Sequence, residues 1–115
     1  MKASKISAIA VLLSFLSFFI LTESVQAKYS GGSGTAGDPY RIGSDANLLQ
    51  LAADANDYNK HFVLIADINL ASYNFTTAVI APDTNNSASG FQGVQFSGIF
   101  DGNGYTISNL ILQRK

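Results

Sequence analysis

The sequence predicts a mainly β fold with one short helix, and two observations favour a coiled β-solenoid. Apolar residues recur at every second position from Phe62 to Leu70, which is the period of a β-strand. Farther along the chain, short strands are separated by corners rich in Gly and Asn, without the spacing of hairpins. The same pattern leaves a small antiparallel meander open as the alternative.

Residues 1–27 have the layout of a secretory signal peptide. Lys2 and Lys5 give a positive start, residues 6–21 form an apolar run interrupted by serines, and Ala27 ends a small-residue pattern. The run is shorter than the roughly 20 residues that span a bilayer comfortably. We therefore expect cleavage after Ala27, a secreted or cell-surface product and no membrane contact after cleavage. The alternative is an uncleaved membrane anchor.

The charge balance and the cysteine count exclude several classes of protein. The 115 residues carry a formal net charge of −1, whereas a nucleic-acid partner calls for a basic surface. The chain has no cysteine, which excludes a disulfide scaffold, a thiolate metal site and a cysteine nucleophile.

The first elements after the signal are a linker, a strand and a helix. Residues 28–39 form a Gly/Ser-rich lead-in that we expect to be flexible, and a short strand is predicted over 40–42. A helix is predicted over 46–54, because Ser44 or Asp45 can cap its first turn. Asn56-Asp57 would end it. Its apolar stripe consists of Leu48, Leu49, Leu51 and Ala52.

A longer strand with one buried face is predicted over 62–70. Because Val63 and Ile65 are also apolar, we expect its first half to be buried on both sides. Val79-Ile80 is predicted as another short strand, stopped by Pro82, and residues 83–90 as a loop.

The last part of the chain predicts a turn and a corner. Residues 101–104, Asp-Gly-Asn-Gly, tolerate the positive φ of a tight turn. Short strands are predicted over 105–107 and 110–112. A continuous strand would point Ile107 away from Leu110 and Leu112, whereas a corner at Ser108-Asn109 lets all three face one core.

Three segments carry a resemblance to a known family. Residues 34–40, GTAGDPY, resemble the GT-x-x-DPY segment of secreted bacterial right-handed parallel β-helix proteins. Residues 61–70 resemble their hFxLxADIDL segment, with Asn69 in place of the second acid. Residues 96–110 resemble FxGxFDGNGHTISNL, with Tyr105 where histidine is usual. The resemblance covers residues 31–112, and such segments often precede GLUG-type repeats.

The resemblance implies the N-terminal cap and first coils of a pectate-lyase-like β-helix over residues 40–115. A capping helix makes physical sense there, since the open end of a solenoid exposes backbone edges and core side chains. At least three repeats are usually needed for a stable solenoid, and residues 62–112 supply about two. We therefore expect the chain to be incomplete, with downstream coils of a longer protein as its partner.

No pattern of residues predicts catalysis or a cofactor. His61 is the only histidine and has no partner at metal-ligand spacing. Asp101-x-Asn103 resembles the start of a calcium loop but lacks the later acid, so a turn is favoured. Asp67 and Asp101 could form a carboxylate pair, although a cap or a corner of its strand is the stronger expectation for Asp67. The serines have no triad partners.

Two sequons match the N-glycosylation pattern, Asn74-Phe75-Thr76 and Asn85-Asn86-Ser87. They would matter only in a eukaryotic secretory pathway, whereas the resemblance points to bacteria.

The function expected from these features is non-catalytic: starting and capping a solenoid in a surface or adhesion-type protein. One alternative is the first segment of a polysaccharide lyase or glycoside hydrolase whose active site lies in later coils. Another is a small carbohydrate-binding module, in which Tyr73 and Tyr105 would stack on a polysaccharide or cell-surface ligand. For most of the aromatic residues, however, packing in the core is the stronger expectation.

Overall fold

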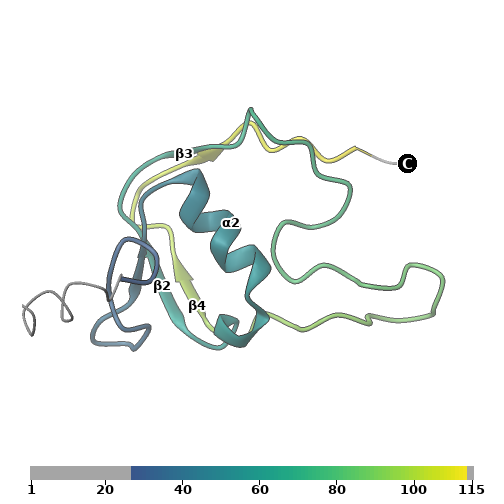
Figure 1. Cartoon of the computed structure of the whole chain (residues 1–115), viewed down its shortest axis with the longest axis horizontal. Coiled ribbons are helices and arrows are strands. Elements are labelled where there is room, and N and C mark those ends of the chain that lie inside the picture. The colour runs from purple at the N-terminus through teal and green to yellow at the C-terminus, as the bar shows by residue number, and fades with distance from the viewer. Residues whose placement is uncertain (1–26, 114–115) are drawn as a thin grey trace, which may run out of the picture.

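The computed structural model of the chain describes residues 27–113 (Figure 1). The proposed signal peptide therefore lies outside the described residues, apart from its last residue, Ala27. In chain order the elements are β1 (Tyr40–Ile42), α2 (Asp45–Ala53), the 3-10 helix η1 (Ala55–Asp57), β2 (His61–Leu64), β3 (Ile68–Asn69), β4 (Ile99–Asp101) and β5 (Ile107–Ser108).

The named strands pair only in parallel over the part of the chain that the structure describes. One sheet has the order β1-β2-β4 and a second contains β3 and β5. In the ladders Phe62 pairs with Phe100 and Ile68 with Ile107, and an isolated parallel bridge joins Phe75 to Leu112. Residues 61–75 and 99–112 therefore follow the same path side by side, as Figure 1 shows. The antiparallel meander does not form.

The hydrophobic core is centred on Phe62, which is 1% exposed. Its ring centroid lies 5.5 Å from that of Tyr29, 5.6 Å from that of Tyr40 and 6.3 Å from that of Phe100. The Phe62 and Phe100 rings are stacked, as expected for inward-facing side chains at paired positions of neighbouring parallel strands. The other buried apolar residues are Tyr29, Ile42, Leu48, Leu51, Tyr58, Leu64, Ile68 and Leu70.

The helix forms almost where the sequence predicts it, over 45–53 instead of 46–54. Ser44 is its N-cap, and its hydroxyl accepts a 3.2 Å hydrogen bond from the amide of Asn47. Leu48 and Leu51 of the predicted stripe are buried against the core. After the helix, Asn56 and Asp57 do not simply end it but belong to η1.

The lead-in of residues 28–39 is not a flexible linker, so that expectation is wrong. Tyr29 is buried, the amide of Ser30 donates to the carbonyl of Arg41, and the amide of Arg41 donates to Gly31, both at 2.9 Å. Gly32 has a φ of +92°, and a Cβ there would lie 2.0 Å from the carbonyl oxygen of Pro39. Glycine therefore permits a close approach and a left-handed backbone here, not mobility.

The predicted strand over 62–70 is divided into β2 and β3 by residues 65–67. Phe62, Leu64, Ile68 and Leu70 remain buried, so the inward alternation holds across the bend. Ile65 is 41% exposed, and the expected burial of both faces is wrong at that position because the chain bends there.

The other predicted strands differ in detail. Val79-Ile80 is not a strand but lies in the long connection between β3 and β4, where no other segment pairs with it. The strand predicted over 105–107 is instead β5, which includes Ser108. The corner follows at Asn109, whose φ is +57°.

Candidate functional site

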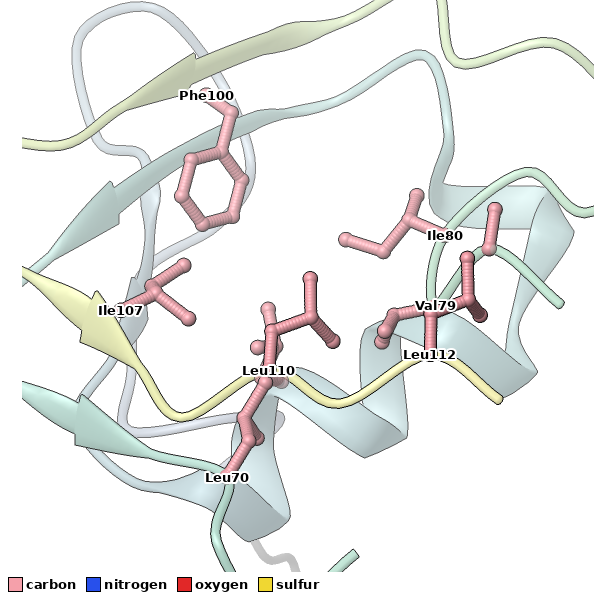
Figure 2. A pocket seen from close by; sticks show the side chains of 9 residues that line it. Leu70, Val79, Ile80, Phe100, Ile107, Leu110 and Leu112 are labelled. Atoms are coloured by element: carbon pink, nitrogen blue, oxygen red, sulfur yellow. The ribbon is translucent and has the colours of Figure 1, made fainter. Parts of the chain in front are cut away.

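The most distinctive surface of the described residues is an open apolar pocket of about 450 Å³, which we call the apolar face (Figure 2). Every side chain that lines it is apolar. They come from α2, β4, β5, the residue after β3, the connection near residue 80 and the segment after the Asn109 corner. The lining residues are Leu48, Leu70, Ala78, Val79, Ile80, Phe100, Ile107, Leu110 and Leu112.

The apolar face confirms one specific prediction from the sequence. Ile107, Leu110 and Leu112 line the same pocket despite their different parity, because the left-handed residue Asn109 turns the chain between them. Figure 2 shows Leu110 and Leu112 reaching toward the same space as Ile80. They nevertheless remain 56% and 59% exposed, so this side of the core is uncovered.

The two edges of the three-stranded sheet, at β1 and at β4, differ sharply. At the β1 edge, residues 30 and 31 hydrogen-bond to Arg41, so the lead-in occupies this edge of the sheet. At the other edge, β4 pairs only with β2 among the described residues. In the second sheet, β5 likewise pairs only with β3. An open parallel edge with an apolar pocket beside it is a surface that other backbone can extend.

Polar side chains hold the two parallel paths in register at their corners. The Asn109 side-chain amide donates to Oδ1 of Asn69 at 3.0 Å, and the amide of Thr106 donates to Oδ1 of Asp67 at 2.8 Å. Oδ1 of Asp101 accepts from the amide of Asn103 at 2.9 Å. Asp67 and Asp101 thus each bind backbone, which matches the expected corner and turn rather than a shared carboxylate site.

A second group of polar side chains joins the start of the lead-in to the end of α2 and to η1. The Tyr29 hydroxyl donates to Oδ2 of Asp57 at 2.7 Å, and Nζ of Lys28 lies 2.6 Å from the same oxygen and 3.2 Å from Oδ2 of Asp54. Burial would raise the pKa of Asp57, but hydrogen bonds from Lys28 and Tyr29 outweigh burial and hold it below its usual range. Sequence reasoning missed this group, because it joins residues 28 positions apart.

Tyr73 and Tyr105, the two residues expected to stack on a sugar, do not form one platform. Tyr73 follows β3 and Tyr105 precedes β5, so the parallel register places them toward opposite ends of that ladder. The Tyr73 hydroxyl donates to Oδ2 of Asp45 at 3.0 Å, which raises the pKa of Tyr73. Tyr105 is 43% exposed.

The remaining sequence candidates lie in structural positions. His61 begins β2, is half-buried, and its backbone amide donates to the carbonyl of Gly34 at 3.0 Å. Within residues 27–113, the structure brings together no group of three metal-ligating side chains. Across the same range, no helix has the length and apolar character to cross a membrane.

Comparisons with known proteins give one similarity. No family model and no solved structure matches the chain. The chain is 37% identical over 89 residues to halomucin from Haloquadratum walsbyi, in a match that covers 72% of this chain and 1% of halomucin. This similarity supports the coarser part of the expected localisation, a secreted or cell-surface protein.

Proposed function

We propose that the chain forms the N-terminal cap and first coils of a right-handed parallel β-helix in a secreted or cell-surface protein. Its role is non-catalytic: it starts a solenoid and closes one end. The observation that carries this proposal is the asymmetry of the sheet, which is blocked by the lead-in beside β1 and open beside β4.

The parallel register supports a stack of coils. Phe62 pairs with Phe100 and Ile68 with Ile107, so an aromatic ring lies against an aromatic ring and an aliphatic chain against an aliphatic chain. The Asn69–Asn109 hydrogen bond adds a polar contact at the corner. A repeat unit that buries one face only against its neighbour is the general design of solenoids.

The occupant that we propose for the apolar face is a further parallel coil of the same polypeptide. The edges of β4 and β5 continue the ladders that these strands already form with β2 and β3, so another coil can pair in the same direction. Its inward side chains would then cover Phe100, Ile107 and Leu110. In a protein as long as halomucin, such stacking would yield an elongated surface.

A carbohydrate-binding module is the less favoured function, because Tyr73 and Tyr105 are separated along the ladder and Tyr73 is engaged by Asp45. Glycan-array binding by the mature chain, lost in Tyr105→Ala, would favour it over the capping role.

The capping proposal is tested on the mature chain, residues 28–115, in solution. With no following coil, the apolar face should bind a fluorescent hydrophobic dye or associate with a second copy. Leu110→Asp and Leu112→Asp should each reduce both effects, because they place a charge in the pocket. Ile111→Asp is the matched control, since Ile111 is 43% exposed but does not line the pocket.

A monomer that binds no dye and protects the amides of β4 and β5 as strongly as those of β2 would contradict the proposal. Hydrogen exchange measures this protection residue by residue.

A further inference from the structure

The long connection between β3 and β4 contains a self-contained loop at residues 83–92, which we call the acceptor loop. Its neck is closed by Asp83, whose Oδ1 accepts from the amides of Asn85 and Gln92, both at 3.1 Å. The Thr84 hydroxyl donates to the carbonyl of Gln92 at 3.1 Å. Figure 1 shows the outer part of this connection extending away from the helix and both sheets. The loop thus holds its own shape without contributing to the core.

The sequon Asn85-Asn86-Ser87 lies within the acceptor loop, and all three of its residues are exposed. The amide of Ser87 donates to Oδ1 of Asn85 at 3.1 Å, and the amide of Ala88 donates to the Asn85 carbonyl at 3.2 Å. These bonds fold the sequon into a tight turn that keeps the Asn85 amide close to the residue carrying the hydroxyl. Among the described residues, the hydrogen bonds of the Asn85 side chain involve Oδ1 alone, which leaves Nδ2 accessible.

The second sequon, Asn74-Phe75-Thr76, is held differently. The amide of Phe75 donates to the carbonyl of Ile111 at 3.2 Å, and its own carbonyl accepts from Gln113 at 2.8 Å. The Phe75 ring lies against Tyr73 and packs on the core. An oligosaccharyltransferase that binds the sequon backbone would first have to break these hydrogen bonds of Phe75 to Ile111 and Gln113.

We propose that Asn85 is an N-glycosylation site of the exported chain and that Asn74 is not. The glycosyl donor is an oligosaccharide linked to a lipid through phosphate. In the transfer, a bond forms between Nδ2 of Asn85 and the anomeric carbon of the sugar. The bond from that carbon to the phosphate oxygen breaks, the lipid phosphate leaves with the electron pair, and the amide loses one proton to a base of the transferase.

The site fits both the location and the packing of the chain. A secreted or cell-surface protein crosses the membrane that carries such donors in cells that glycosylate asparagine. A glycan on an exposed loop adds bulk and solubility without displacing any core side chain, since the neck bonds lie within residues 83–92. Transfer requires a cell whose export pathway glycosylates asparagine, and it does not depend on the family that the sequence resembles.

The test is mass spectrometry of the whole chain after export from cells that carry an N-oligosaccharyltransferase. A reporter glycoprotein made in the same cells shows that transfer is active. We expect a glycan mass on the peptide containing Asn85, and its loss to background in Asn85→Gln and in Ser87→Ala. Ser87→Thr should restore it, because threonine is the other accepted hydroxyl residue.

Two variants serve as matched controls. Asn86→Gln changes the neighbouring asparagine, which is followed two positions later by Ala88, and it should retain the glycan. Asn74→Gln should leave the glycan mass unchanged. Circular dichroism of each variant checks that the fold is kept. An unmodified Asn85 beside a glycosylated reporter, or a glycan that persists in Asn85→Gln, would overturn the proposal.

Discussion

Tyr29 donates a 2.7 Å hydrogen bond to Asp57, and both side chains are buried although they lie 28 positions apart in the sequence. The bond joins the start of the lead-in to the end of η1, so it closes the chain over one end of the core. Lys28 forms an ion pair with the same carboxylate from the solvent side, with Nζ 2.6 Å from Oδ2 of Asp57.

Tyr29→Phe should lower the free energy of unfolding by about 1–3 kcal/mol, since it removes a buried hydrogen bond to a charged group. Chemical denaturation of the mature chain measures the loss. Tyr105→Phe removes an exposed hydroxyl and should change stability by less than about 0.5 kcal/mol. Equal effects of the two substitutions would mean that the Tyr29–Asp57 bond does not hold the lead-in.

The same group predicts how stability depends on pH. The pKa of Asp57 is lowered in the folded state, so its contribution is complete above its ordinary value of about 3.9 and is lost as the pH falls through the folded value. The pKa of Tyr29 is raised by burial and by its bond to Asp57, so its contribution is complete below about pH 10. Above that pH the contribution is progressively lost. Stability should therefore be highest between about pH 4 and pH 10.

Denaturation midpoints across this range check the expectation. Tyr29→Phe should make the alkaline decline shallower, because the buried phenol no longer titrates. An alkaline decline that is identical in wild type and Tyr29→Phe would rule out this assignment.

Two glycines test whether the lead-in is part of the folded unit. Gly32→Ala should destabilise the chain by more than about 1 kcal/mol, since Gly32 has positive φ and a Cβ would collide with Pro39. Gly37→Ala is the control, because a Cβ at Gly37 meets nothing within 4 Å. Thermal unfolding of both variants gives the comparison. A flexible lead-in would tolerate the two changes equally.

Truncation of Phe62, at the centre of the core, should cause the largest loss of unfolding free energy. Phe62→Ala should cost about 3–5 kcal/mol through lost burial and a residual cavity, and Phe62→Leu about 1 kcal/mol. Because the first variant can fail to fold, the second keeps the measurement quantitative. Phe91→Ala, at a 44% exposed position, should be close to neutral in the same denaturation experiment.

Local signals identified several elements of the fold. Ser44 ahead of an apolar stripe predicted the helix to within one residue at each end, because capping and helical periodicity act over a few positions. The alternation around Phe62 predicted which side chains face inward. The division of the predicted strand at residues 65–67 was not predicted, because the inward parity continues across it. The exposure of Ile65 and the contact from Asp67 to Thr106 reveal it.

The two tyrosines considered for sugar stacking show what residue type alone leaves open. Tyr73 and Tyr105 have the chemistry to stack on a sugar, but their separation is decided by the pairing of β3 with β5. The role of glycine in the lead-in was misread for the same reason. A Gly-rich segment can be mobile or tightly folded, and the difference depends on which backbone it meets, here that of Pro39 and Arg41.

The sequence by itself determined the short helix and the inward-facing apolar positions, because both follow from the local period of the chain. It also determined the convergence of Ile107, Leu110 and Leu112, because a local corner interrupts the period between them. The tertiary structure decided the register of the parallel pairing, the buried Tyr29–Asp57 bond and the residues that line the uncovered apolar face. These features join residues that are distant in the sequence, for example 28 positions apart for Tyr29 and Asp57 and 40 for Asn69 and Asn109. Contacts at that range depend on how the whole chain folds rather than on any local pattern.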